Sequence, residues 1–139
     1  MIILDTNVLS AVMLRVPDRR VVAWLDQQPR SSIWTTSVTL FETRFGLEIL
    51  PTGKRRADFF EDFERLLASI SYRIVPFDTE AAHEASVLMA SRKLKGRPRE
   101  LRDTMIAGIV LSRHATLATR NVRDFDDISA AVVDPWNPS

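Results

Sequence analysis

The sequence predicts an α/β domain of three layers, in which helices cover both faces of a mainly parallel sheet of four to five strands. Short apolar runs alternate with longer segments of helical periodicity along most of the 139 residues, which is typical of a parallel sheet with crossover helices. The first run, Ile2-Ile3-Leu4, is wholly apolar, as expected of a strand buried on both faces. No interior linker divides the chain, so residues 1–139 are predicted to form a single domain.

The N-terminal half is predicted to contain two strands and three helices. Asn7 follows the first strand and is a favourable N-cap for the first helix. The second strand is rich in β-branched and aromatic residues, and Pro51-Thr52-Gly53 ends the third helix. In chain order, the expected elements are a strand at 2–4, helices at 8–13 and 19–28, a strand at 33–36 and a helix at 38–50.

The strongest helical pattern of the chain begins after residue 54. Phe59, Phe63, Leu66 and Ile70 recur at intervals of four, three and four residues. Further on, Gly96-Arg97-Pro98 breaks the chain between two more helices. The expected elements are a helix at 55–70, a strand at 73–76, helices at 79–94 and 101–114, strands at 115–119 and 130–133, and a surface tail at 134–139.

The composition of the chain restricts the cell compartment and the kinds of metal site that are expected. Cysteine is absent, which excludes disulfides and thiolate metal sites and fits a cytoplasmic location. The longest stretch without a charged residue, 31–41, has eleven residues, whereas a membrane span needs about 18 or more. Asp5 interrupts the first apolar run, so no signal peptide is expected. The net charge of +1 indicates no partner.

Acidic residues stand where the predicted strands end. Asp5 ends the first strand, Glu42 lies about one turn into the helix after the second, and Asp103 lies near the start of the helix before the fourth. Asn121, with Asp124 nearby, follows the fourth strand directly. Ligands of open α/β sheets bind at the carboxyl ends of the strands, so these side chains are predicted to converge on one edge.

Such a cluster needs a positive partner. Two carboxylates about 5 Å apart repel by roughly 3 kcal/mol at an effective dielectric constant of 20, which corresponds to about two pKa units. A divalent cation would relieve this repulsion. The set holds oxygen ligands only, which suits Mg²⁺ or Mn²⁺ rather than Zn²⁺. Sites of this kind serve phosphodiester hydrolysis, because the cation activates water and steadies the charge on the phosphate.

Each acid also has a purely structural interpretation. Asp5 can cap the helix after the first strand. Glu42 can complete a capping box with Thr39, and Asp103 can be the N-cap of its own helix. Asp124 can be a solvated loop acid. Only their joint placement predicts a metal site.

Four segments, in order and at matching spacing, resemble the motifs of PIN-domain ribonucleases of the VapC toxin type. The first is an apolar strand followed by Asp-x-Asn, and the second is a helix that carries a glutamate and then a glycine, Gly46. The third has an aspartate before Ile-Ala, and the fourth reads Thr-Arg-Asn-x-x-Asp-Phe. The corresponding segments are 2–9, 36–42, 102–107 and 118–125, and residues 133–136 resemble the tail of many bacterial members.

The resemblance covers essentially the whole chain and implies a PIN fold and an Mg²⁺- or Mn²⁺-dependent endoribonuclease. It implies that Asp5, Glu42 and Asp103 are the catalytic metal ligands, with Thr6 and Asn7 orienting Asp5. It also implies a toxin that forms a homodimer and is neutralised by a small VapB-like antitoxin in a type II toxin–antitoxin system.

The fourth acid is the one departure from the family pattern. Some relatives have an aspartate where Asn121 stands. The fourth ligand is therefore replaced by Asn121, supplied by Asp124, or missing. An asparagine can hold a water molecule at the cation but adds no negative charge.

Basic and aromatic residues give weaker signals about partners. The segment 92–102 carries six basic residues against one acid, directly before Asp103, and could hold an RNA backbone; the alternative is a solvated helix end. Phe59, Phe60 and Phe63 form either core or a groove for a partner helix. The candidate RNA contacts are Arg97, Arg99, Arg102 and Arg120.

Other functions compete with this interpretation. Haloacid dehalogenase-like phosphatases also begin with a strand that ends in aspartate, but they need a second aspartate where Asn7 stands, so we reject that family. A catalytically weak PIN module that acts by binding an antitoxin or a nucleic acid is favoured by the missing acid at Asn121. A DNA nuclease of the same fold is the remaining alternative.

Overall fold

The computed structural model describes residues 1–138 and contains one sheet of five parallel strands. The strand order is β3-β2-β1-β4-β5, so the first strand of the chain lies at the centre. Every pairing is parallel, which confirms the predicted fold class and means that each connection crosses from one end of the sheet to the other. The strands are β1 (Ile2–Leu4), β2 (Ile33–Thr36), β3 (Ile74–Val75), β4 (Thr116–Ala118) and β5 (Val132–Val133).

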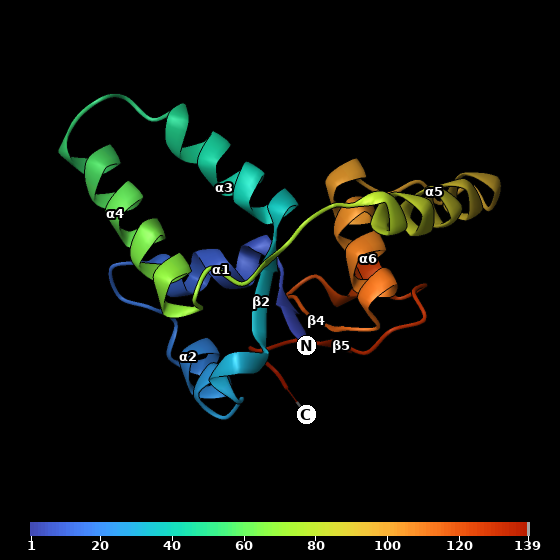
Figure 1. The fold of residues 1–139 in the computed structure, drawn as a ribbon, viewed down its shortest axis with the longest axis horizontal. Helices are drawn as coiled ribbons and strands as arrows, with labels where there is room; N and C mark the ends of the chain where they lie inside the picture. The colour runs from blue at the N-terminus through green and yellow to red at the C-terminus, as the bar shows by residue number, and fades with distance from the viewer. Residues whose placement is uncertain (139) are drawn as a thin grey trace.

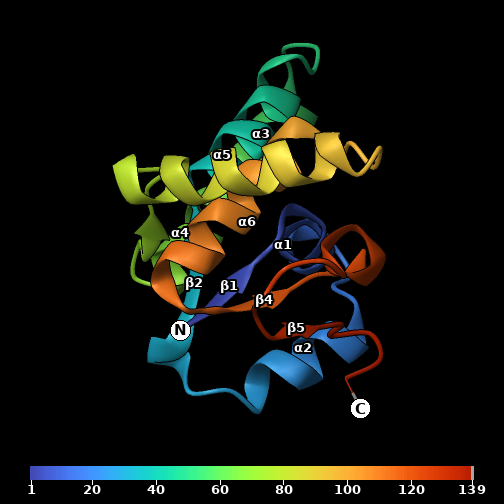
Figure 2. The ribbon, with the colours of Figure 1, turned by 90° about the vertical axis from the view of Figure 1, so that its right-hand side faces the viewer.

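Helices form the two outer layers (Figures 1 and 2). The helices α1, α2 and α4 lie on one side of the sheet, and α5 and α6 lie on the other, while α3 rises from the end of β2. Their bounds are α1 (Thr6–Met13), α2 (Arg19–Asp26), α3 (Ser37–Glu48), α4 (Lys54–Ser69), α5 (Thr79–Leu94) and α6 (Leu101–Arg113), with 3₁₀ turns η1 (Arg30–Ser32) and η2 (Val122–Phe125).

The central strand shows how the sheet divides the core. Ile3 packs with Val75, Leu117 and residues of α5 and α6. Its neighbour Leu4 belongs to a separate cluster with residues of α1 and α2. Successive side chains of a strand point to opposite faces, so a strand that is covered on both faces is apolar throughout, as Ile2-Ile3-Leu4 predicted.

Three helix caps test the sequence predictions, and of the alternatives considered only capping of the first helix by Asp5 is confirmed. Asp5, and not Asn7, caps α1, because the amide of Thr6 donates to Asp5 Oδ1 at 2.8 Å and the helix begins at Thr6. Thr36 caps α3 through the amide of Thr39, so the capping box of Thr39 with Glu42 does not form. Glu100 accepts from the amide of Asp103 and caps α6, which leaves the Asp103 carboxylate uncommitted to capping.

Helices α5 and α6 approach each other closely at Gly108. A Cβ atom at this position would lie 2.5 Å from the carbonyl oxygen of Ala81 and 2.7 Å from the Cβ atom of Ala85. Contacts this short are sterically forbidden, so only glycine fits without a shift of one helix.

None of the helices described is long and apolar enough to cross a membrane.

Candidate active site

Asp5 is buried at the carboxyl end of β1, with only 3% of its surface exposed. Its Oδ2 accepts from Thr119 Oγ1 at 2.8 Å and from Asn7 Nδ2 at 3.1 Å, while Oδ1 accepts from the amide of Thr6. Burial raises the pKa of Asp5, and these hydrogen bonds oppose the rise because they favour the charged form. The carboxylate is therefore held in one orientation by residues that follow β1 and β4.

Glu42 faces the same edge of the sheet from α3. Its Oε1 accepts from Thr6 Oγ1 at 3.2 Å, and its Oε2 lies 3.8 Å from Arg102 Nη1. Partial burial raises the pKa of Glu42, and the charge of Asp5 adds to this rise. Thr6 thus connects the Asp5 and Glu42 segments, since its amide donates to Asp5 and its hydroxyl donates to Glu42.

Of the acids at this edge, Asp103 has the most strongly raised pKa. Burial and then the charges of Asp5, Glu100, Asp124 and Glu42 raise its pKa to about 6. Glu100 is a sequence neighbour of Asp103, but Asp5, Glu42 and Asp124 come from distant segments, and the fold brings their charges within electrostatic reach of Asp103. The charges of Asp5 and Glu42 thus act on Asp103, whereas the metal-binding role of the three acids stays a prediction.

The acids do not form a closed cage. Within residues 1–138, no three His, Cys, Asp or Glu side chains lie close enough together to hold a metal ion. Both oxygens of Asp5 accept hydrogen bonds, and Glu42 turns toward Thr6 and Arg102. An all-oxygen set with raised pKa values still fits Mg²⁺ or Mn²⁺, because Mg²⁺ keeps several waters and takes only one or two protein carboxylates.

Asp124 and Asn121 occupy different positions relative to this cluster. The charge of Asp124 raises the pKa of both Asp5 and Asp103, so Asp124 adds negative charge to the site. The backbone amide of Asn121 donates to Thr119 Oγ1 at 3.1 Å, which places Asn121 in the network around Asp5.

Two residues of the site were not singled out by sequence reasoning. Thr119 is fully buried and donates to Asp5, and the fourth motif, which contains it, was the only signal for it. Glu100 caps α6 and raises the pKa of Asp103 by its charge. A lone glutamate after a proline gives no sequence signal for either role.

The basic segment before Asp103 is not a uniform surface. Arg92, which contributed to the predicted basic stretch, is buried and cannot contact RNA. Arg99 donates to the carbonyl of Arg123 and lies 3.5 Å from Asp124, so internal contacts occupy its guanidinium. Arg102 pairs with Glu100 and approaches Glu42. Arg97 is exposed.

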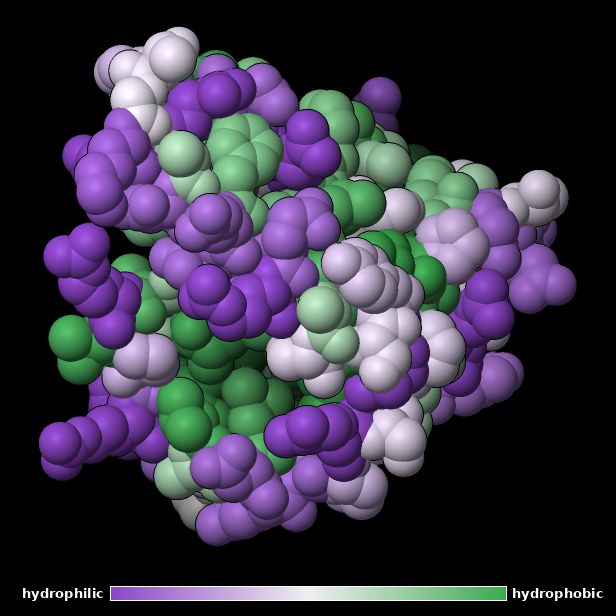
Figure 3. All heavy atoms as spheres, turned by 60° about the vertical axis from the view of Figure 1, so that its left-hand side comes forward, coloured by the Kyte–Doolittle hydropathy of each residue, from purple (hydrophilic) through white to green (hydrophobic). Residues whose placement is uncertain are grey.

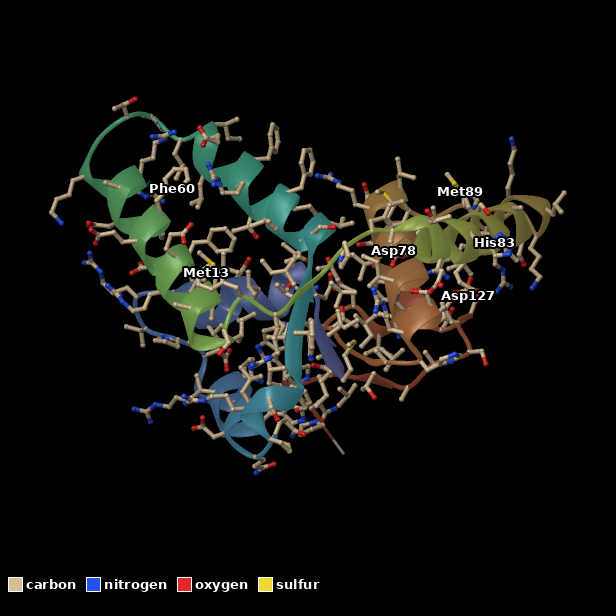
Figure 4. The ribbon with its side chains drawn as sticks, in the orientation of Figure 1. Met13, Phe60, Asp78, His83, Met89 and Asp127 are labelled. Carbon is tan, nitrogen blue, oxygen red and sulfur yellow. The ribbon has the colours of Figure 1, made fainter. Side chains whose placement is uncertain are left out.

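Arg120 and the aromatic residues of α4 pack against their neighbours. The Arg120 guanidinium lies 4.7 Å from the ring centroid of Trp136, and Trp136 Nε1 donates to Asp18. On α4, Phe63 is buried core as predicted. Phe60 points from α4 toward α3 (Figure 4) and is contacted by Arg56, whose guanidinium lies 4.8 Å from the ring.

The raised pKa of Asp103 predicts a pH-dependent stability in the cation-free protein. Its pKa is about 6 in the native state and 3.8 in the reference state, so the native state binds more protons between these values. The free energy of unfolding therefore falls as the pH rises from about 4 to 6. Discounted for solvent screening, the loss is about 1 kcal/mol.

Urea denaturation of wild type and Asp103→Asn at pH 4 to 8 isolates this effect from other groups. The variant should be more stable than wild type above pH 6, and the difference should vanish toward pH 4. A difference that stays constant over this range would contradict the assignment of the shift to Asp103.

Comparison with known proteins identifies relatives along the entire chain. The family model described as PIN domain matches residues 2–131. The chain is 36% identical to "VapC ribonuclease Y4jK" of Sinorhizobium fredii over 100% of both chains. It is 33% identical to "Toxin FitB" of Neisseria gonorrhoeae over 99% of both. Among solved structures, "Structure of FitAB bound to IR36 DNA fragment" matches with a TM-score of 0.90 and 33% identity, over 100% of this chain and 98% of that chain.

Proposed function

Because this chain belongs to the PIN domain family and has VapC ribonuclease and FitB toxin homologues, we propose that it is a divalent-cation-dependent endoribonuclease and the toxin of a type II toxin–antitoxin system. The observation that carries the proposal is the acidic cluster at the carboxyl edge of the sheet, where the charges of four further carboxylates, those of Asp5, Glu100, Asp124 and Glu42, raise the pKa of Asp103. Acids gathered in this way are unfavourable unless a cation joins them.

The residues that would hold Mg²⁺ or Mn²⁺ are Asp5 and Asp103, with Glu42 and Asp124 completing the acidic shell. Asp124 supplies the fourth acid, since its charge acts on both Asp5 and Asp103, and Asn121 adds none. When bound, the cation polarises the phosphate and activates a water molecule. The chain's own contribution is orientation: Thr6, Asn7 and Thr119 fix the carboxylate of Asp5.

Glu42 is the group assigned to proton transfer. Its pKa is raised by partial burial, which brings it closer to the range in which a general base works best. Arg102, whose guanidinium lies 3.8 Å from Glu42, is placed to attract the RNA backbone to this edge. Arg97 and Arg120, both exposed residues, would extend the same track.

The test is cleavage of RNA by the purified, metal-free protein. We expect RNA to be cut after addition of Mg²⁺ or Mn²⁺ and to stay intact with EDTA. DNA of the same sequence should stay intact throughout. RNA that survives both metals would support the catalytically weak PIN module instead, and preferential cutting of DNA would support the DNA nuclease.

Apolar surface supports a partner on the α1, α2 and α4 side. Figure 3 shows an apolar hollow on this face. A cavity of about 380 Å³ there is lined by Leu4, Val12, Val22, Leu25 and Ile70 among others. We assign this hollow to an apolar segment of a small VapB-like antitoxin, in keeping with the FitAB structure, in which the related protein is part of a complex.

A second apolar surface supports the homodimer. Phe41 and Phe45 of α3 and Ile49, the C-cap of this helix, recur every four residues, and 61%, 52% and 67% of their respective surfaces are exposed. The rings of Phe41 and Phe45 stack, with their centroids 6.4 Å apart, so they present one continuous stripe. Sedimentation equilibrium tests this assignment, and a monomer at micromolar concentration would contradict it.

We also propose that the protein acts in the cytoplasm.

A further inference from the structure

Arg92 is a buried arginine on α5 that the proposed chemistry leaves unexplained. Only 3% of its surface is exposed. Its Nε and Nη2 donate to the two carboxylate oxygens of Asp127, each at 2.8 Å. Its Nη1 donates to Thr104 Oγ1 at 3.0 Å, and Nη2 also donates to the backbone carbonyl of Asp124 at 3.2 Å. One guanidinium therefore joins three segments.

Two of these segments carry acids of the candidate site. Thr104 is the neighbour of Asp103 in the first turn of α6, and the carbonyl that Arg92 holds is that of Asp124 itself. Asp127, labelled in Figure 4, follows η2 and is the anchor of the ion pair. The guanidinium is planar and rigid, so its four donor contacts fix the separation and angle between α6 and η2.

Stability alone is a weak reason to place an arginine here. A buried ion pair loses much of its Coulomb energy to desolvation, and apolar residues of similar volume often stabilise a core equally well. The α5–α6 interface is already apolar and close-packed around Gly108. An arginine is better suited than an apolar residue to hold a backbone carbonyl and a hydroxyl in a defined geometry.

We propose that Arg92 is a positioning residue that sets the placement of Asp124 relative to Asp103, so that both acids can serve one divalent cation. This inference rests on the proposed cation-dependent function. Arg92 acts through geometry and not through its charge: Asp127 neutralises it, and the hydrogen bond from Arg92 lowers the pKa of Asp127. The groups whose charges raise the pKa of Asp103 are all carboxylates, and Arg92 is not among them.

The experiment measures Mn²⁺ affinity by isothermal titration calorimetry without RNA. Arg92→Lys keeps the positive charge and can reach Asp127, but an ammonium group cannot reproduce the planar fork. Its Mn²⁺ affinity should fall by about 10-fold or more, as is usual when a group that orients metal ligands is lost. Half-maximal RNA cleavage should need correspondingly more Mn²⁺, and saturating Mn²⁺ should restore most of the rate.

Two further variants make the result decisive. Thr104→Val removes one contact of Arg92 and leaves its pair with Asp127 intact, so it should fold even if Arg92→Lys does not, and its Mn²⁺ affinity should fall by about threefold or more. Arg73→Lys is the matched control. Arg73 donates to the carbonyl of Ile33, at the end of β2 that lies away from the candidate site. Loss of the Arg73 guanidinium should therefore leave Mn²⁺ affinity unchanged.

The outcomes separate the two proposals. A wild-type protein that neither binds Mn²⁺ nor cleaves RNA would refute the proposed function. A wild type that does both, together with folded Arg92→Lys and Thr104→Val proteins of unchanged Mn²⁺ affinity, would overturn the role of Arg92 alone. If only Thr104→Val folds, its Mn²⁺ affinity decides the matter in the same way.

Discussion

Asp5→Asn should abolish RNA cleavage, lowering kcat/KM by about 1,000-fold or more, which corresponds to roughly 4 kcal/mol of lost transition-state stabilisation. Asparagine is nearly the same size. Its side-chain oxygen can still accept from the amide of Thr6, and the amide nitrogen that replaces Oδ2 can donate to the Thr119 hydroxyl. The substitution removes the charge that a cation needs. The variant should stay folded, because burial already disfavours the charged form of Asp5. Asp103→Asn should lose activity for the same reason.

Initial cleavage rates at saturating Mn²⁺ and melting temperatures of the same preparations check this prediction. Asp26→Asn is the matched control, since Asp26 is an exposed aspartate at the end of α2. It should cleave like wild type. Wild-type rates in both Asp5→Asn and Asp103→Asn would remove the catalytic roles assigned to these acids.

Gly108→Ala should destabilise the fold by about 2 kcal/mol and lower the melting temperature by roughly 5 °C. The added Cβ atom would lie 2.5 Å from the carbonyl oxygen of Ala81 and 2.9 Å from the amide nitrogen of Ala85. Both are backbone atoms within α5, so relief requires the two helices to move apart. Alanine is the better helix former by about 1 kcal/mol, and the clash outweighs this gain.

Gly46→Ala provides the opposite case in the same protein. Gly46 lies in α3, and a Cβ atom there would meet nothing within 4 Å. Only the helix propensity changes, so this variant should gain about 0.5–1 kcal/mol. Urea denaturation of the two variants gives the comparison. Equal effects of the two substitutions would show that close packing at Gly108 does not limit stability.

The fold could be predicted from the sequence because the sheet is buried on both faces. The strands then appear as short runs of apolar or β-branched residues, and the crossover helices show helical periodicity. The residues at which helices and strands begin and end were harder to predict. Asp5 and Asn7 are both good N-caps, and the choice depends on where β1 stops. The amide of Asp5 donates to the carbonyl of Ala118, a contact that only the folded sheet specifies.

The candidate site was predictable to the extent that it follows strand ends. Asp5 and Asp103 were located by their positions next to predicted strands. Arg92 was assigned to a basic surface, because composition counts charges and does not reveal burial. Its partner Asp127 lies 35 residues away, and no local pattern connects the two.

The central position of β1 has a consequence for synthesis of the chain. Strand β1 pairs with β4, which contains residues 116–118, and Asp5 accepts a hydrogen bond from Thr119, 114 positions later. Until this segment emerges from the ribosome, β1 lacks one neighbour and Asp5 lacks the hydroxyl donor to its Oδ2. A nascent or truncated polypeptide that lacks residues 116–119 thus has no assembled centre, and a toxic nuclease with this connectivity would remain harmless until that segment has been made.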